Sequence, residues 1–250
     1  MLPKAKKSYS QNWLVDGTAI KKIIAAADIK PGENVLEIGP GTGILTRALV
    51  DAGAKVTAIE TDSSLIEPLR EEFGDKIELI EGDALSFTPS ITSYKLVANI
   101  PYSITSDILR RYLTMDPGPE RLVLLVQKEV ANRIIARPPE MSLLSIVCQL
   151  YATCSRAGSV PAGAFRPIPK VDSAIVVLDR LDLSASDYSP EEVISVAKRG
   201  FAARRKQLQK NLGKDGKTAL QTIGLNQKIR AQELTPNDWI ELTHNLQKKS

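Results

Sequence analysis

The chain has 250 residues and a mass of 27.3 kDa, which is enough for one large domain or for a domain with a small appendage. Its 43% of hydrophobic and 25% of charged residues are typical of a packed globular protein and exclude a disordered chain. The net charge of +4 is by itself weak support for a nucleic-acid partner. One histidine (His244) and two cysteines (Cys148 and Cys154) are too few for the usual zinc sites, so we expect no metal and two reduced thiols.

Strands and helices are predicted to alternate over most of the chain. A first helix is predicted after Asp16, a residue type that caps helices, and it is expected to end at Pro31-Gly32. Strands are predicted for residues 34–38, 55–60, 76–80, 95–99, 122–127 and 175–178. Helices are predicted for residues 44–53, 63–73, 106–113, 129–137 and 142–151. This alternation indicates an α/β fold with a mostly parallel sheet covered on both faces.

The pattern changes near Leu181. Residues 182–189 are polar and predict a linker. Helices without intervening strands are predicted for residues 190–200, 204–212, 218–223 and 236–246. We therefore expect a first domain over residues 1–183 and a small all-helical domain over residues 184–250.

Charge is unevenly distributed along the chain. Residues 23–97 contain six basic and thirteen acidic residues, a net charge of −7, whereas residues 198–217 contain eight basic and one acidic residue, a net charge of +7. The N-terminus adds Lys4, Lys6 and Lys7. Two interpretations of the basic segment are equally supported: it binds a polyanion away from the sheet, or it is simply a solvated helix face.

Membrane and export signals are not visible in the sequence. No apolar run reaches the ~20 residues that a spanning helix needs. The N-terminal sequence MLPKAKKSYSQNW lacks the apolar region of a signal peptide. We expect a cytoplasmic protein that has no membrane partner.

Three glycines, Gly39, Gly41 and Gly43, follow the first buried strand. Glycines allow the backbone to turn sharply and let a ligand approach the main chain closely. Their G-x-G-x-G spacing departs from the G-x-G-x-x-G of dinucleotide sites, because Ile44 occupies the last position. The loop suits S-adenosylmethionine, which has no phosphate, although a plain turn is the alternative.

Two carboxylates follow the next two strands. Glu60 ends the second strand and is placed to accept hydrogen bonds from ribose hydroxyls, while Asp83 follows the third and is placed to accept from an adenine amine. Because the carboxyl ends of parallel strands meet at one edge of a sheet, we expect both near the glycine loop. Each alone is also compatible with a solvated acid at a strand end.

The fourth strand ends in Asn99-Ile100-Pro101-Tyr102. The exocyclic nitrogen of adenine is a poor nucleophile because its lone pair is delocalised into the ring. The Asn99 side-chain oxygen and the Ile100 carbonyl are placed to accept both amine hydrogens, which directs the lone pair at a sulfonium methyl group. Pro101 fixes the loop and Tyr102 offers a face for stacking. The alternative is a plain turn after a strand.

These motifs resemble those of the ribosomal RNA adenine N6-dimethyltransferases, specifically the small-subunit type. The resemblance extends over residues 10–14 (SQNWL), 36–43, 99–102, 126–131 and 160–173 (VPAGAFRPIPKVDS). Ser10, Trp13, Ile100 and Ser103 depart from the usual Gly, Phe, Leu and Asn of this family.

The resemblance implies a Rossmann-like class I methyltransferase fold with a seven-stranded, mostly parallel sheet and a helical C-terminal domain that binds rRNA. It implies that S-adenosylmethionine is contacted by Asn12, Leu14, Gly39, Gly41, Gly43, Glu60, Asp83 and Asn99. It implies that the target adenine is held by Asn99, Ile100, Pro101 and Tyr102, with Phe165 stacking on its other side, whereas the residues alone would make Phe165 a core aromatic. It implies phosphate contacts by Lys198, Arg199, Arg204, Arg205, Lys206 and Lys210.

The function that this resemblance implies is dimethylation of two adjacent adenosines near the 3′ end of small-subunit rRNA. The expected partners are that rRNA and the pre-ribosomal small subunit, and we expect a monomer. A large-subunit rRNA adenine N6-methyltransferase of the macrolide-resistance type is an alternative, as is a non-catalytic RNA-binding assembly factor. A DNA adenine methyltransferase is disfavoured, because those enzymes more often carry D/N-P-P-Y.

Overall fold

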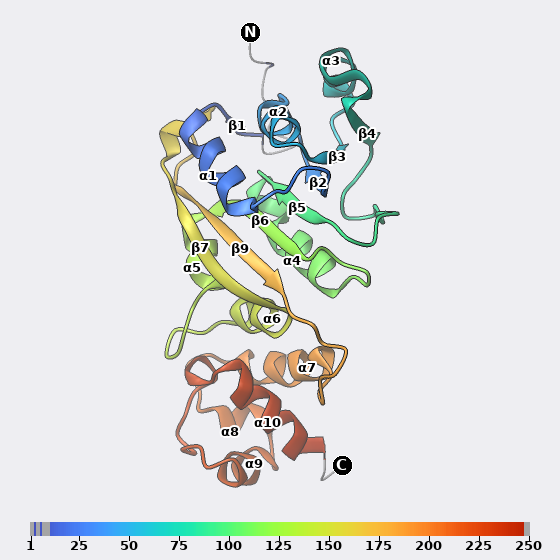
Figure 1. Ribbon diagram of the computed structural model, residues 1–250. Coiled ribbons are helices and arrows are strands. Elements are labelled where there is room, and N and C mark those ends of the chain that lie inside the picture. Colours follow the sequence, from blue (N-terminus) through green and yellow to red (C-terminus); the bar gives the residue numbers. More distant parts are fainter. Residues whose placement is uncertain (1–2, 4–5, 7–10, 248–250) are drawn as a thin grey trace. The chain divides into compact units, whose positions relative to one another are not determined.

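The computed structural model describes residues 3, 6 and 11–247 (Figure 1). By their internal contacts these residues form two compact units. The first unit comprises residues 1–131 and 154–180, and the second comprises residues 132–153 and 181–250. The second unit therefore contains the stretch expected to be all-helical and, in addition, a helical segment from the middle of the chain.

A seven-stranded sheet forms the frame of the first unit, in the order β4-β3-β2-β5-β6-β9-β7. Its strands are β2 (Asn34–Ile38), β3 (Lys55–Glu60), β4 (Ile77–Glu81), β5 (Lys95–Ala98), β6 (Arg121–Gln127), β7 (Ala152–Val160) and β9 (Ser173–Arg180). The pairs β4-β3, β3-β2, β2-β5 and β5-β6 are parallel, and β6-β9 is antiparallel. The expected mostly parallel seven-stranded sheet is confirmed.

Helices precede, separate and follow the parallel strands of this sheet. They are α1 (Gly17–Ala27), α2 (Ile44–Asp51), α3 (Ser63–Phe73), α4 (Thr105–Thr114) and α5 (Lys128–Ile134), with short 3-10 helices η2 (Gly74–Lys76), η3 (Tyr102–Ile104) and η4 (Ala162–Ala164). Asp16 caps α1 as predicted, because its carboxylate accepts a hydrogen bond from the Ala19 backbone N–H at 2.7 Å. The helix ends at Ala27, before Pro31-Gly32, since Asp28 adopts the left-handed conformation with φ 47°.

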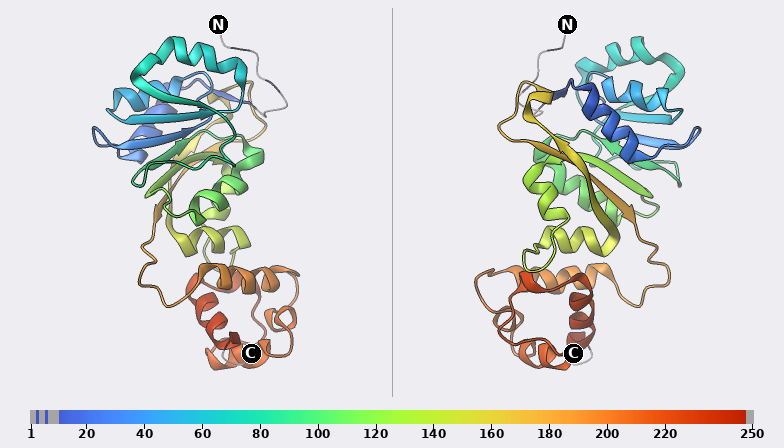
Figure 2. Two further views of the ribbon diagram at one scale, coloured as in Figure 1. Left: turned by 90° about the vertical axis from the view of Figure 1, so that its right-hand side faces the viewer. Right: turned by 60° about the vertical axis from the view of Figure 1, so that its left-hand side comes forward.

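The core lies on both faces of this sheet. Ile23 of α1 and Leu49 of α2 pack against Val35, Val97 and Val123, and all five side chains are 0% exposed. Because side chains alternate along a strand, the intervening strand residues point to the opposite face, where Figure 2 shows α4. Helices on both faces leave the carboxyl ends of the parallel strands as the open edge.

Three strands were not predicted from the residue pattern. In β7 only the two end residues are buried and most of the others are exposed, so no apolar alternation marks it. It lies at an edge of the sheet, where a strand needs fewer apolar side chains. The other two, β1 (Trp13–Leu14) and β8 (Phe165–Arg166), are two residues each and pair only with one another.

The second unit is helical. Its helices are α6 (Leu143–Tyr151), α7 (Pro190–Phe201), α8 (Leu208–Leu212), α9 (Gly216–Thr222) and α10 (Pro236–Gln247), with a 3-10 turn η5 (Ala231–Glu233). Thr235 caps α10, because its hydroxyl accepts a hydrogen bond from the Asp238 backbone N–H at 3.1 Å. The helix predicted for 204–212 is wrong in its first half, since residues 202–206 form a turn and α8 begins only at Leu208.

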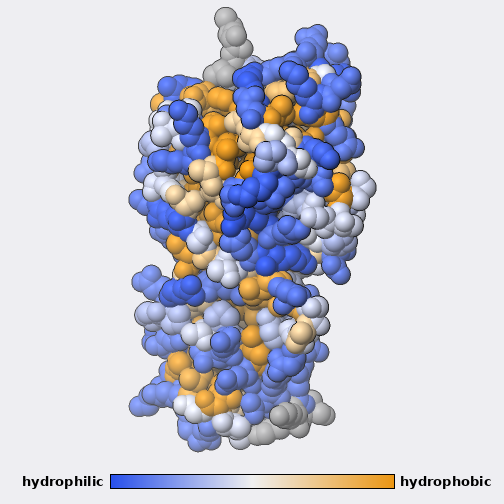
Figure 3. Space-filling model, viewed as in Figure 1, coloured by the Kyte–Doolittle hydropathy of each residue, from blue (hydrophilic) through white to orange (hydrophobic). Residues whose placement is uncertain are grey.

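Within the described residues, no helix is long and apolar enough to cross a membrane. Hydrophilic side chains cover most of the face shown in Figure 3.

Candidate active site

A cavity of about 290 Å³ lies in the first unit at the carboxyl ends of β2, β3, β4 and β5. Parallel strands bring the residues that follow them to this one edge of the sheet, as Figure 1 shows. The cavity is lined by the cofactor and adenine residues expected from the sequence, with one exception: Asn12, Leu14, Gly39, Gly41, Glu60, Asp83, Asn99, Ile100, Pro101, Tyr102 and Phe165.

The exception is Gly43, which is not among the lining residues described. It begins α2 as its N-cap with φ 75°. A Cβ atom at this position would lie 2.7 Å from the Phe73 ring. The structure therefore gives Gly43 a packing role that permits α2 and α3 to approach.

Gly41 and Glu60 are joined directly. One Glu60 carboxylate oxygen accepts a hydrogen bond from the Gly41 backbone N–H at 3.1 Å, and the other accepts from the N–H groups of Thr61 and Asp62 at 2.9 Å. Burial raises the pKa of Glu60, and these backbone hydrogen bonds oppose that rise. The carboxylate thus fixes the glycine loop and faces the cavity with the rest of its acceptor capacity.

Trp13 covers the glycine loop. A Cβ atom on Gly41 would lie 2.9 Å from the indole ring, so only glycine fits beneath it. The indole N–H donates to the Pro3 carbonyl at 3.0 Å. The departure from the usual Phe therefore adds a polar anchor, while Ser10 of the same motif lies outside the described residues.

Asn99 and Tyr102 are held in place by neighbours from other segments. The Asn99 amide N–H donates to the Asn12 carbonyl at 3.4 Å, and no described residue donates to its side-chain oxygen. The Tyr102 hydroxyl lies 2.7 Å from the hydroxyl of Ser173, which is 0% exposed. Burial raises the pKa of Tyr102, and the Ser173 hydrogen bond opposes that rise, so the phenol stays neutral at physiological pH.

Phe165 joins the core and the cavity. It is 1% exposed, belongs to the same hydrophobic cluster as Leu14, and lines the cavity. The short β1-β8 ladder pairs Leu14 with Phe165, and the Val15 N–H donates to the Ala164 carbonyl at 2.9 Å. The structure thus combines the core position expected from the residues alone with a place in the cavity wall.

Asp83 is the most exposed of the lining carboxylates. It accepts a hydrogen bond from the Leu85 backbone N–H at 2.9 Å, and the Phe87 N–H donates to its carbonyl at 3.0 Å. These bonds fix the loop after β4 and orient the Asp83 side chain.

Glu37 also lines the cavity, and the sequence analysis gave it no role. It is 1% exposed, and neither carboxylate oxygen has a hydrogen-bond partner among the described residues. Burial raises the pKa of Glu37 to about 8, the Thr46 hydroxyl opposes the rise, and the charge of Glu60 adds to it. The available signal was an acidic residue inside an otherwise apolar strand.

The N-terminal motif is tied to the start of α3. Asp62 caps this helix and accepts hydrogen bonds from the Gln11 amide at 2.8 Å and the Lys6 ammonium at 2.6 Å. Asp62 is 2% exposed at its side chain. These contacts hold Asn12 and Trp13 against the cavity, a role that the sequence analysis assigned to neither Gln11 nor Asp62.

The donor set fits S-adenosylmethionine. Three carboxylates, Glu37, Glu60 and Asp83, line the cavity, and the described lining contains no lysine, arginine or histidine. Such a wall suits a ligand that carries a sulfonium, an ammonium and hydroxyl groups. The space that Gly41 leaves permits close approach of that ligand to the backbone.

A family model described as "Ribosomal RNA adenine dimethylase" matches residues 2–248. The chain belongs to this family. The predicted family, the class I methyltransferase fold and the predicted enzyme class, an rRNA adenine dimethyltransferase, are thereby confirmed.

Relatives match almost the whole length of the chain. "Ribosomal RNA small subunit methyltransferase A" of Thermosynechococcus vestitus is 40% identical over 97% of this chain and 97% of its own. The protein of the same name from Dehalococcoides mccartyi is 38% identical over 96% of this chain and 87% of its own.

Two solved structures are similar to this family member. A dimethyladenosine transferase from Plasmodium falciparum has a TM-score of 0.82 at 29% identity, covering 94% of this chain and 98% of the other. The 23S rRNA methyltransferase ErmE has a TM-score of 0.77 at 30% identity, covering 94% and 100%.

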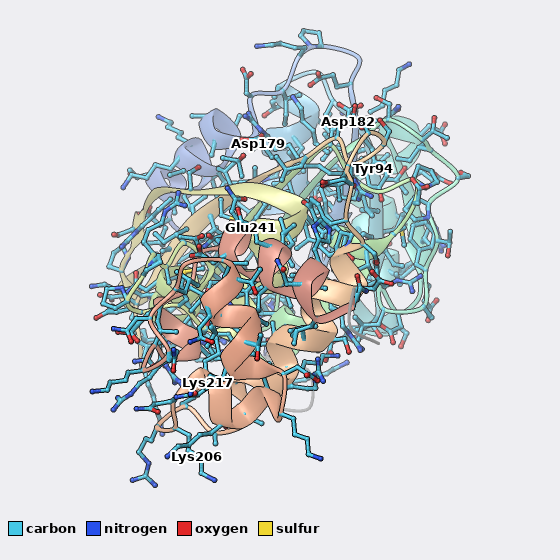
Figure 4. The ribbon with its side chains drawn as sticks, turned by 90° about the horizontal axis from the view of Figure 1, so that it is seen from below. Tyr94, Asp179, Asp182, Lys206, Lys217 and Glu241 are labelled. Carbon is cyan, nitrogen blue, oxygen red and sulfur yellow. The ribbon has the colours of Figure 1, made fainter. Side chains whose placement is uncertain are left out.

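The cations predicted to contact RNA lie in the second unit of the dimethylase. All six are exposed, and none makes an ion pair with another described residue: Lys198, Arg199, Arg204, Arg205, Lys206 and Lys210. Figure 4 shows the Lys206 side chain extending outward from the ribbon. Asn211 donates to the carbonyls of Gly200 and Ala203 at 2.6 and 3.1 Å, which shapes the turn that carries Arg204.

Proposed function

We propose that the protein uses S-adenosylmethionine to dimethylate the N6 amines of two adjacent adenosines near the 3′ end of small-subunit rRNA. The observation that carries this proposal is the convergence of Asn99, Tyr102 and Phe165 on the cavity that also holds Glu60 and Gly41. The small-subunit target is supported by identities near 40% to relatives named for that subunit, against 30% to ErmE.

Glu60 would accept hydrogen bonds from ribose hydroxyls, and Asp83 from the adenine amine of the cofactor. Asn12, Leu14, Gly39 and Gly41 would contact the cofactor through the cavity wall. Bound S-adenosylmethionine supplies an electrophilic methyl group on a sulfonium. Every other requirement of the reaction falls on the side chains and backbone of this chain.

Asn99 activates the target amine. Its amide N–H is already bonded to Asn12, so its oxygen faces the cavity as an acceptor. By accepting an amine hydrogen together with the Ile100 carbonyl, it pulls the nitrogen toward tetrahedral geometry and exposes the lone pair. After transfer the methylated nitrogen is cationic and loses one proton to solvent. The neutral monomethylated amine retains one hydrogen for the same acceptor, which allows a second transfer.

Tyr102 and Phe165 hold the target base. Tyr102 is fixed by Ser173 and Phe165 by the β1-β8 ladder, so both aromatic faces are positioned before the base arrives. Pro101 restricts the loop that carries Tyr102. A base turned out of its helix gains stacking on these faces, which offsets the cost of unstacking.

We also propose that the helical unit binds rRNA phosphates through its six exposed cations. Contacts to base edges are not needed for this task, because phosphate contacts fix the position of the protein on the RNA without reading its sequence. The partners proposed here are small-subunit rRNA and the immature small subunit, and the protein is proposed to act as a cytoplasmic monomer.

Methyl transfer from tritiated S-adenosylmethionine tests the proposal. Immature small subunits, mature large subunits and naked rRNA are compared as substrates, and the labelled nucleotide is identified after digestion. We expect N6,N6-dimethyladenosine in small-subunit rRNA only. Label confined to large-subunit rRNA would overturn the target and favour the resistance-type activity.

The variant Asn99→Ala separates catalysis from binding. We expect it to lose methyl transfer by ~100-fold or more while its affinity for small-subunit RNA stays within about twofold. If the wild type transfers no methyl group to any rRNA, the protein is instead a binding factor.

A further inference from the structure

Glu37 is the buried group for which the proposed mechanism has no use. Its carboxyl group is 1% exposed, and neither oxygen accepts a hydrogen bond from a described residue. An ionised carboxylate without a partner is costly to bury, so the empty cavity favours its uncharged form. Burying this carboxyl group lowers the stability of the fold. Because Glu37 also lines the ligand cavity, we expect its role to lie in ligand binding.

Glu37 shares this wall with two other acids. Its Cα partner on β3 is Ala58, two residues before Glu60, so Glu37 and Glu60 lie on the same face of the sheet. Asp83 lines the same cavity, and the described lining holds no positively charged side chain to neutralise the three. From α2, the Thr46 hydroxyl lies close enough to lower the pKa of Glu37, but it carries no charge and does not titrate in this range.

Cofactor and product of the proposed reaction differ at one atom by one charge. S-Adenosylmethionine carries a sulfonium, and the product left after transfer carries a neutral thioether in its place. Both ligands carry the same ammonium and carboxylate, so the sulfonium is the only charge that distinguishes them. In a cavity of low dielectric this added positive charge favours an ionised carboxylate. A buried carboxyl group with no positively charged side chain in the described cavity lining is therefore sensitive to this difference.

We propose that Glu37 is a specificity-determining residue that makes the site prefer the cationic cofactor over the neutral product. Glu37 is protonated in the empty and the product-bound cavity. When the cofactor binds, Glu37 releases its proton to solvent and becomes a carboxylate. After transfer it takes a proton back from solvent, and the product loses its electrostatic partner. This inference rests on the proposed use of S-adenosylmethionine.

Calorimetric titration of the full-length protein tests it without relying on activity. S-Adenosylmethionine and S-adenosylhomocysteine are titrated between pH 6 and 9 in pairs of buffers that differ in ionisation enthalpy, which counts released protons. For the wild type at pH 7 we expect release approaching one proton with the cofactor and none with the product. The preference for cofactor should rise up to ~10-fold per pH unit until about pH 8 and then level off.

Two variants separate Glu37 from the rest of the wall. Glu37→Gln should abolish proton release and lower the cofactor preference at pH 8 by ~10-fold or more, with the remaining preference independent of pH. Asp83→Asn is the matched control, because the adenosine that it is proposed to contact is common to both ligands. It should weaken both to a similar degree and leave proton release unchanged.

Each outcome decides one claim. Equal proton release with both ligands, or release that persists in Glu37→Gln, overturns the role of Glu37. Failure of either ligand to bind the wild type overturns the proposed cofactor site instead. Should Glu37→Gln not fold, as judged by its circular dichroism, the wild-type proton count still decides, because a count of zero with the cofactor refutes the inference.

Discussion

Single hydrogen bonds position the aromatic and polar side chains of the cavity. Tyr102 follows β5, and its partner Ser173 begins β9, where it pairs with Gln127 of β6. The N-I-P-Y motif was sufficient to single out Tyr102. Ser173 stood only at the end of the 160–173 block, and its contact depends on the antiparallel pairing of β6 and β9, which no local pattern specifies.

The bond between Tyr102 and Ser173 should contribute to methyl transfer. Either Ser173→Ala or Tyr102→Phe removes it, at a cost of about 1 kcal/mol, so each variant should lose about fivefold in kcat/KM. The measurement is steady-state methyl transfer to small-subunit RNA. The double variant should lose no more than either single variant, because both remove one interaction. Additive losses would show that the two side chains act independently.

Asp62 links charge to stability at the residue scale. Burial acts to raise its pKa, but hydrogen bonds from Lys6, Ser64 and Gln11 outweigh it and lower the pKa of Asp62 to about 2 from 3.8. A carboxyl group with a lowered pKa stabilises the fold above its unfolded pKa and loses that contribution as the pH falls through the folded value. The contribution is on the order of 2 kcal/mol above about pH 5 and is lost between about pH 4 and pH 2.

The variant Asp62→Asn should show this dependence, because asparagine keeps the helix cap and removes the charge. In urea unfolding, the free energy of unfolding of the variant should lie about 2 kcal/mol below that of the wild type at pH 6, and this difference should shrink at pH 4 and again at pH 2.5. The corresponding difference for Lys6→Met should also shrink as the pH falls. A difference that stays constant with pH would assign the effect to hydrogen-bond geometry and not to charge.

At the scale of elements, the glycine loop illustrates two uses of one residue type. Gly41 leaves room beneath Trp13 at the cavity, whereas Gly43 leaves room for Phe73 where α2 meets α3. The G-x-G-x-G spacing was correctly placed between β2 and α2. The spacing could not distinguish a glycine that faces a ligand from one that faces a neighbouring helix, because that depends on the packing of α3.

Gly43→Ala should destabilise the protein through packing as well as backbone strain. We expect a loss of ~2–5 kcal/mol, from the positive φ and from the overlap with the Phe73 ring. Gly32→Ala is the matched control, since its φ is 86° and nothing lies within 4 Å of the added Cβ. It should lose only ~1–2 kcal/mol in urea unfolding.

A second substitution tests the cause of that difference. Phe73→Leu removes the atoms that a Cβ on Gly43 would meet, so the double variant should be less destabilised than the sum of the two single variants. Equal costs for Gly43→Ala and Gly32→Ala would leave the packing explanation without support.

The elements that the sequence missed share a physical cause. Buried parallel strands such as β2 and β6 were predicted because most of their residues are apolar. The edge strand β7 is polar and exposed along most of its length, so only its place in the sheet identifies it. Residues 204–206 of the turn were predicted as helix because the side chain that shapes the turn, Asn211, lies several residues further along.

The same limit applies to the site. Residues at strand ends were found, because parallel topology alone brings Glu60, Asp83 and Asn99 to one edge. Glu37 was not assigned a role, since its significance lies in the absence of partners, and that absence is visible only once the described neighbours are placed around it.

Opposite charges are concentrated in one segment of each unit. Residues 23–97, with a net charge of −7, belong to the first unit, and residues 198–217, with a net charge of +7, belong to the second. A cationic cofactor and a polyanionic RNA make opposite demands on a surface. Because the two charged segments lie in separate units, each ligand can meet a surface of opposite charge. Cofactor affinity and RNA affinity should therefore respond to different substitutions.

Replacing Arg204, Arg205 and Lys206 together by alanine should test this separation. If each contacts a phosphate, its loss removes about 0.7–0.9 from the slope of log K against log salt concentration, so the triple variant should flatten the slope by about 2–3. Binding to small-subunit RNA is measured between 50 and 200 mM salt by fluorescence anisotropy. Calorimetry should find the affinity for S-adenosylmethionine within about twofold of the wild type.

The matched control replaces Lys21, Lys55 and Lys76, three exposed lysines of the first unit, and removes the same charge. It should leave the salt slope close to that of the wild type, because the effect depends on phosphate contacts and not on net charge. An equal change in slope for both variants would show that RNA responds only to overall charge, and an unchanged slope in the first variant would remove these three residues from the RNA interface.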